Sequence, residues 1–78
     1  MAQRILLDNT NLLDVIIEND HYQLHYGFHR LANFRKNDAA AKRITVVQVA
    51  NMGVKKSVTS RAFDVNPSSI YFWLEIYD

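Results

Sequence analysis

The 78-residue chain contains no cysteine, one proline and two glycines. Without cysteine it can form no disulfide and no cysteine-ligated zinc site, which excludes zinc fingers and agrees with a reducing compartment. Its longest apolar runs are a few residues long, far below the roughly 20 that cross a bilayer, and the N-terminus lacks the features of a signal peptide. We therefore expect a cytoplasmic protein with no membrane partner.

The sequence also lacks the features of an enzyme. It has no glycine-rich phosphate loop and no serine or cysteine nucleophile motif, and a chain of this length offers little volume for a cleft. We expect no catalytic residue, no cofactor and no small-molecule substrate. The hydrophobic share of 49% and the charged share of 22% are those of a globular protein. The length predicts a single domain over residues 1–78 with a narrow margin of stability.

Acidic residues are nearly absent from the middle of the chain. Residues 30–63 hold eight basic residues and one acidic residue, Asp38, whereas the segments on both sides have an excess of acidic residues. Such an asymmetry indicates a polyanionic partner, but a solvated helical surface gives the same pattern. Charge alone leaves both interpretations open.

Residues 13–28 alternate between apolar and polar side chains, with one interruption at Asn19-Asp20. A period of two is typical of β-strands, and both interrupting residues tolerate positive φ, so we predict a hairpin with a two-residue turn. Its register pairs Glu18 with His21, Ile17 with Tyr22, Val15 with Leu24, Asp14 with His25 and Leu13 with Tyr26, and Phe28 continues the apolar side. Gly27 is expected to form a bend or bulge.

Three histidines, His21, His25 and His29, share one side of this segment. Their spacing is not a strong metal-binding motif, and the hairpin offers Asp14 and Glu18 as cross-strand partners. We predict no metal site.

A helix is predicted over residues 38–52. Asn37 or Asp38 can cap its start, and Gly53 can end it in a left-handed conformation. The β-branched run at residues 44–47 favours a strand, but the caps and the length favour the helix. The expected buried stripe contains Ile44, Val47 and Asn51, flanked by Ala40 and Ala50. Residues 30–37 are polar and basic, and their secondary structure is left open.

Residues 55–77 have the features of two helices joined by a tight turn. The first helix covers about residues 55–63, where Ser60 provides the small inward residue of a close helix contact, and Asp64 occupies a position that often needs positive φ. Asn66 followed by Pro67 is a strong helix start, because the asparagine caps and proline loses no hydrogen bond there. The buried face of the second helix is expected to contain Ile70, Trp73, Leu74 and Tyr77, at helical spacing.

This segment resembles the helix-turn-helix of bacterial transposases and small repressors. The matching residues are Ser60, Phe63, Val65, Asn66, Ile70, Tyr71, Trp73 and Leu74, and residues 42–48 and 51–54 resemble the preceding helix of the transposase group. The resemblance covers about half the chain, with Asp64 where glycine is usual and Thr59 where an aliphatic residue is usual. The fold class expected is α+β, mainly α: a β-hairpin extension (1–29) followed by a three-helix bundle (38–77) containing the helix-turn-helix.

The resemblance implies sequence-specific binding of double-stranded DNA, as the end-recognition domain of a transposase or as a small transcriptional regulator associated with the nucleoid. The base-reading positions would be Asn66, Pro67, Ser68, Tyr71, Phe72 and Glu75. The natural phosphate contacts are Lys42, Arg43, Lys55, Lys56 and Arg61. None of the base-reading residues is arginine, so part of the specificity is expected outside this helix or in DNA shape.

The alternative function is a protein-interaction module that uses the apolar hairpin together with Tyr71 and Phe72. Both functions are compatible with a homodimer, since helix-turn-helix proteins commonly act as dimers. The chain stops one residue beyond the predicted second helix, which suggests the N-terminal fragment of a longer protein. In a transposase, the catalytic carboxylates and metal would then lie downstream.

Overall fold

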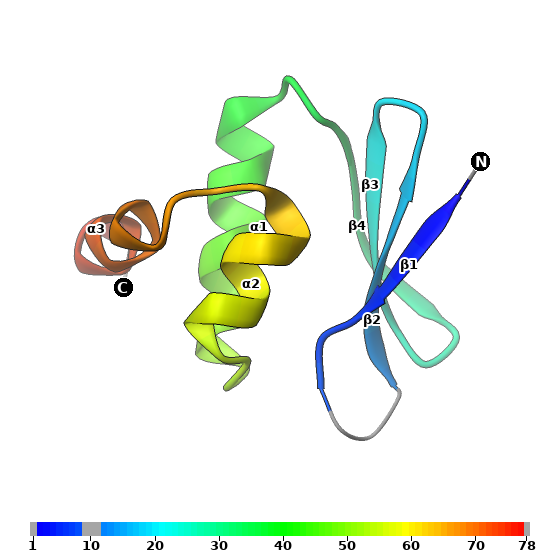
Figure 1. Ribbon diagram of the computed structural model, residues 1–78, viewed down its shortest axis with the longest axis horizontal. Coiled ribbons are helices and arrows are strands. Elements are labelled where there is room, and N and C mark those ends of the chain that lie inside the picture. The colour runs from blue at the N-terminus through cyan, green and yellow to red at the C-terminus, as the bar shows by residue number, and fades with distance from the viewer. Residues whose placement is uncertain (1, 9–11, 78) are drawn as a thin grey trace. The chain divides into compact units, whose positions relative to one another are not determined.

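The computed structural model of the protein describes residues 2–8 and 12–77. Four strands are followed by three helices, and the chain divides into two compact units, residues 1–39 and residues 40–78. The first unit holds the strands, and the second holds the helices apart from the first residue of α1 (Figure 1). None of the helices in the described part of the chain has the length and hydropathy that a bilayer crossing requires.

The strands form one antiparallel sheet in which neighbours in sequence are neighbours in space. They are β1 (Gln3–Leu6), β2 (Leu13–Glu18), β3 (His21–Tyr26) and β4 (His29–Arg35), in the order β1-β2-β3-β4. The predicted hairpin is β2 and β3, and its register is confirmed at all five predicted pairs. Asn19 has a φ of 56° and Gly27 has a φ of 61°, as their turn positions require.

The fold-class prediction is wrong, because the first half of the chain is a four-stranded sheet and not a hairpin extension of a helical bundle. Strand β1 was missed because it is four residues long. Strand β4 was missed because His29, Arg30, Asn33 and Arg35 give it a polar sequence, and a bulge interrupts its period of two. Phe28 also differs from expectation: it lies in the turn between β3 and β4 and is fully exposed, at 105%.

The two faces of the sheet differ in composition. Side chains on one face are apolar and mostly buried: Leu13, Val15, Tyr22, Leu24 and Phe34. The Tyr22 and Phe34 rings lie 5.4 Å apart across β3 and β4, a separation at which aromatic pairs add to the stability that burial provides. The other face is predominantly polar, as is common for an antiparallel sheet with one solvated side.

Helix α1 (Ala39–Asn51) confirms the predicted helix, and Gly53 ends it with a φ of 92°. The capping signals therefore outweighed the β-branched run. The predicted stripe is only partly correct. Val47 is buried, but Ile44 is 60% exposed, and Asn51 and Ala40 are also exposed. The buried set is Thr45, Val46, Val47 and Val49. Apolar residues of α1 occur all around its axis, so helical spacing alone was compatible with more than one buried stripe.

Helices α2 (Lys56–Phe63) and α3 (Pro67–Tyr77) begin and end within a residue of their predicted bounds. Three residues join them, Asp64, Val65 and Asn66. Asp64 adopts the left-handed conformation, with φ 54° and ψ 53°, and its N–H donates to the Ser60 carbonyl. The Val65 N–H donates to the same carbonyl at 3.0 Å. The turn thus satisfies backbone groups at the end of α2 and changes the direction of the chain within three residues.

Candidate nucleic-acid interface

The turn between α2 and α3 is held on both sides by side-chain hydrogen bonds. The Ser60 hydroxyl donates to the Val65 carbonyl, which ties α2 to the turn. The Asn66 Oδ1 accepts from the Ser68 N–H at 3.0 Å and from the Ser68 hydroxyl at 2.7 Å. Asn66 is therefore the N-cap of α3, with Pro67 at the first helical position, as the sequence predicted. These bonds fix where α3 starts relative to the end of α2.

Buried side chains of α2 and α3 form the inner side of this pair of helices. Thr59, Ala62 and Phe63 on α2 and Ile70 on α3 are buried. The Thr59 hydroxyl donates to the Lys55 carbonyl at 3.1 Å, so this buried polar atom is satisfied within its own helix. Thr59 is therefore accommodated at a position where the helix-turn-helix usually has an aliphatic residue, and its hydroxyl is not left unpaired.

The buried face predicted for α3 is correct only at its centre. Ile70 is fully buried, while Trp73 and Leu74 are half-buried. Tyr77 is 52% exposed, which contradicts its predicted burial. It lies in the last turn of α3, so helical spacing overestimated how far burial extends along this helix.

The opposite side of α3 is exposed along its whole length. The six residues proposed from the sequence as base-reading are all exposed, namely Asn66, Pro67, Ser68, Tyr71, Phe72 and Glu75. Ile76 joins them and was not anticipated. This side carries no basic residue, and its largest side chains are Tyr71, Phe72 and Ile76. Any cation beside α3 must therefore come from another element.

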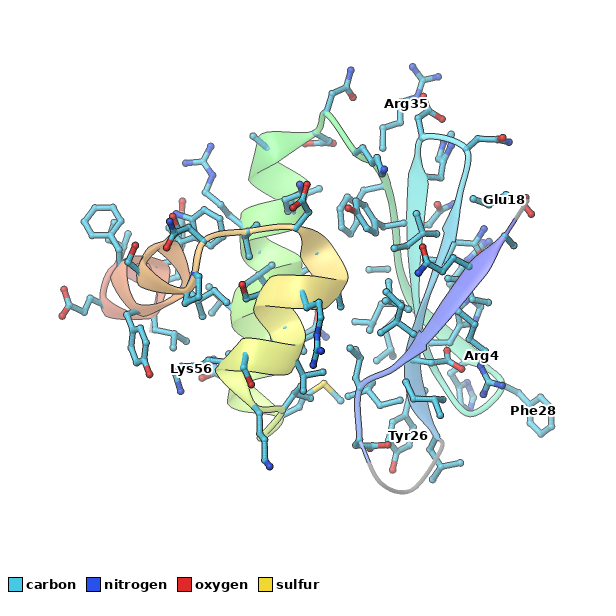
Figure 2. The ribbon with its side chains drawn as sticks, viewed as in Figure 1. Arg4, Glu18, Tyr26, Phe28, Arg35 and Lys56 are labelled. Atoms are coloured by element: carbon cyan, nitrogen blue, oxygen red, sulfur yellow. The ribbon has the colours of Figure 1, made fainter. Side chains whose placement is uncertain are left out.

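Helix α2 supplies that cation. The Lys56 ammonium lies 5.3 Å from the centre of the Tyr71 ring, within the range of a cation–π contact. Lys55, at the N-cap of α2, and Arg61 are exposed. Lys56 is half-buried, and Figure 2 shows it on the side of α2 where α3 lies. The start of α2 and the middle of α3 thus form one surface that combines positive charge with an aromatic hydroxyl.

The remaining two predicted phosphate contacts are less accessible. Lys42 and Arg43 lie on α1, are half-buried, and each takes part in another interaction. Their positions around α1 fall on the same side as the buried residues Val46 and Val49. The structure therefore places Lys56 of α2 against Tyr71, whereas Lys42 and Arg43 of α1 are already engaged in other interactions.

The polar groups of the sheet also differ from their predicted pairing. Asp14 accepts from Arg4 at 2.5 Å and not from His25, although Asp14 and His25 are cross-strand neighbours. His25 Nε2 lies 3.1 Å from Gln23 Oε1, and His21 Nδ1 lies 2.9 Å from Asp20 Oδ1. His21 and His25 thus contact residues close to them in sequence. The pairing of Asp14 with Arg4 depends on β1, which was not predicted.

Comparisons of the chain with protein-family models, with curated proteins and with solved structures found no match.

Proposed function

We propose that the protein binds double-stranded DNA through α2, the three-residue turn and α3. The observation that carries this proposal is the capped turn itself, which presents α3 with one side packed and the other side exposed from Asn66 to Ile76. A helix held in this way can enter the major groove, whose width of about 12 Å admits an α-helix.

In this docking, the exposed side of α3 approaches the bases. Ser68, Tyr71 and Glu75 offer hydroxyl and carboxylate groups for hydrogen bonds, and Phe72 offers an apolar surface for a thymine methyl. Ser68 already donates to Asn66, so its hydroxyl acts toward DNA as an acceptor. Lys55, Lys56 and Arg61 supply phosphate contacts, which fix position and provide affinity without reading sequence.

The resemblance to transposases and small repressors supports two biological settings for this activity. The protein would recognise transposon ends, or it would act as a small transcriptional regulator. In either setting the chain itself locates DNA and performs no chemistry on it.

The test is equilibrium binding of a fluorescent duplex, measured by anisotropy over a series of salt concentrations. Lys55, Lys56 and Arg61 would release about three counterions, which contribute roughly −3 to the slope of log K against log salt. A pool of random duplexes supplies the probe, and selection from that pool gives the preferred site. Binding that does not change with salt would contradict the proposal, because phosphate contacts cannot be salt-independent.

The exposed apolar residues of α3 favour a second candidate function, binding of a protein partner. Tyr71, Phe72 and Ile76 are each more than half exposed and lie on one side of the helix. Sedimentation of the protein over a hundredfold concentration range tests the case in which the partner is a second copy. Self-association lost in Phe72→Glu, with DNA binding absent in both proteins, would favour this candidate over the first.

A further inference from the structure

The outer face of β3 and β4 carries an unusual set of side chains. Three cross-strand pairs follow one another on that face: His25 with Arg30, Gln23 with Asn33, and His21 with Arg35. Every one of these six side chains can donate a hydrogen bond, and none is acidic. We call this set the β3–β4 donor face.

A bulge in the sheet assembles this face. Arg30 and Arg35 are five residues apart, an odd spacing that places side chains on opposite sides of a regular strand. The register shifts between Leu24 and His25, so β4 has one extra residue, Leu31, at that point. Both arginines therefore pair with histidines that share one face. Without the bulge, the two positive charges would be divided between the faces.

The arginines of the donor face are exposed, and the acidic residues of the same face, Asp14 and Glu18, lie on β2, on the other side of β3. Arg30, Asn33 and Arg35 are exposed, and in the described part of the chain neither arginine takes part in an ion pair. Arg4, on the same side of the sheet but on β1, is instead held by Asp14. Figure 2 shows Arg35 at one end of the β3–β4 ribbon and Phe28 at the other. The free positive charge of the sheet is thus concentrated along its β4 edge.

The spacing of β3 and β4 and of their side chains is close to the dimensions of the DNA major groove. β4 is the edge strand and β3 lies about 4.8 Å behind it, so these two strands with their side chains span the width of a major groove of about 12 Å, and β2, paired with β3 on its other side, stays outside the groove. Alternate residues on one strand are separated by about 6.6 Å, which is close to two base steps of about 3.4 Å each. Figure 1 shows β1 crossing β3 and β4 at an angle, so the twist of the sheet turns its far edge away from the ribbon.

We propose that the β3–β4 donor face is a second contact for double-stranded DNA, with Arg30, Asn33 and Gln23 reading base edges in the major groove. The identity of the partner rests on the proposed function of α2 and α3. The residue types support this choice. Arginine is the commonest reader of guanine, and asparagine and glutamine read adenine, yet the exposed side of α3 has no arginine and only Asn66 of the amides. Duplex RNA is disfavoured because its major groove is too deep and narrow for side chains to read.

Protection of the sheet edge is the competing explanation for the charges on β4. Charged residues and bulges commonly prevent edge strands from pairing with other chains. That explanation requires charge on β4 but not a common face for the two arginines, whereas DNA contact requires the common face. Substituting two neighbouring basic residues that lie on opposite faces of the sheet therefore distinguishes the two explanations.

Lys36 provides the matched control. It follows Arg35 directly, and its ammonium lies 5.9 Å from the centre of the Tyr22 ring, on the apolar side of the sheet. In the anisotropy assay on the full chain, Arg30→Ala with Arg35→Ala should make the salt slope shallower by about 2 and weaken binding on the order of tenfold per arginine at 0.1 M salt. Lys36→Ala should leave the slope unchanged. Equal effects of Lys36→Ala and Arg35→Ala would overturn the proposal, since they would indicate charge without a docking face.

Base reading is tested separately from charge. Arg30→Lys keeps the charge but loses the bidentate fork, so it should keep the salt slope and lower the preference for a selected site over a scrambled duplex by roughly 10- to 100-fold. Asn33→Ala should also lower that preference without changing the slope. Unchanged preference in both variants, with thermal melting showing a folded protein, would overturn the reading role.

The outcomes separate this inference from the proposed function. Loss of binding in the Arg30, Arg35 double variant with no effect of Lys55→Ala and Lys56→Ala supports the donor face and contradicts docking by α2 and α3. The reverse pattern overturns the donor face alone. Vesicles containing phosphatidylserine test the other polyanion that a basic edge attracts. Arginine-dependent binding to vesicles, with none to duplex DNA, would overturn both proposals.

Discussion

At the residue scale, α3 offers a comparison between two isoleucines six residues apart. Ile70 is 0% exposed, whereas Ile76 is 56% exposed on the opposite side of the helix. We expect Ile70→Ala to lower the free energy of unfolding by about 2 to 5 kcal/mol, because it removes buried methyl groups and leaves a cavity. Ile76→Ala should change stability by less than about 0.5 kcal/mol, as is usual for exposed positions.

Urea denaturation followed by the fluorescence of Trp73 measures both variants, since Trp73 lies on the same helix and is half-buried. Equal destabilisation by the two substitutions would mean that the packed side of α3 has been assigned incorrectly. In that case the exposed set from Asn66 to Glu75 could not be the DNA-reading side either.

Asp64 permits a second residue-scale prediction. Its left-handed conformation at φ 54° costs most residues roughly 1 to 2 kcal/mol but costs glycine almost nothing. Asp64→Val should therefore lower the free energy of unfolding by at least about 1 kcal/mol, because a β-branched residue is poorly tolerated there. Asp64→Gly serves as the control and should be at least as stable as the parent in thermal melting. A stable valine variant would show that the turn adopts another conformation.

At the scale of single elements, α2 and α3 should respond differently to substitution. Lys55→Ala and Lys56→Ala should each weaken binding to all duplexes equally and make the salt slope shallower by about one, because a lysine on a phosphate reads only charge. Tyr71→Phe should instead relax preference at individual base pairs by about 1 to 3 kcal/mol per good contact. It removes only the hydroxyl and preserves the ring beneath Lys56.

Ser68→Ala needs a separate control in that experiment, because the Ser68 hydroxyl also donates to the cap residue Asn66. The loss of that bond is expected to cost about 0.5 to 1.5 kcal/mol of stability, which thermal melting reports independently of DNA. Titrations against a selected and a scrambled duplex provide the readout. If the lysine variants alter sequence preference while Tyr71→Phe and Ser68→Ala alter nothing, α3 is not the reading helix.

The elements that local chemistry specifies strongly were predictable from the sequence. The β2–β3 register followed from the period of two around Asn19-Asp20, and the start of α3 followed from Asn66-Pro67. Strand β4 was not predictable, because its bulge breaks the alternation and its solvated side is basic. The prediction of the buried stripe of α1 failed because apolar residues occur all around that helix. Only packing against other residues could determine which of them are buried.

The candidate site was predictable to a similar extent. The exposed side of α3 followed from the helical spacing of Ile70, Trp73 and Leu74. The Lys56–Tyr71 contact was not predictable, because it depends on the angle at which α2 and α3 meet. The donor face was also beyond prediction, since Arg30 and Arg35 share a side only through the extra residue on β4. Long-range features of this kind arise from pairing and packing and not from local sequence.

At the scale of the whole molecule, the two DNA contacts should combine in a measurable way. Lys55 and Lys56 belong to one compact unit, and Arg30 and Arg35 belong to the other. Contacts to separate phosphates release separate counterions, so their contributions to the salt slope add. The three cations proposed for α2, Lys55, Lys56 and Arg61, together with the two arginines predict a parent slope of roughly −4.5, at about −0.9 per contact.

The variant lacking Lys55, Lys56, Arg30 and Arg35 should then show a slope shallower by about 3.6, the sum of the changes in the two double variants. Anisotropy titrations of the parent, both double variants and the quadruple variant at four salt concentrations measure these slopes, and circular dichroism confirms that each protein is folded. Lys36→Ala in the parent background controls for loss of net charge. A quadruple variant no weaker than one of the double variants would mean that a single surface holds the DNA. The surface whose double variant it matches would be the one in contact, and the other would have to be removed from the docking described here.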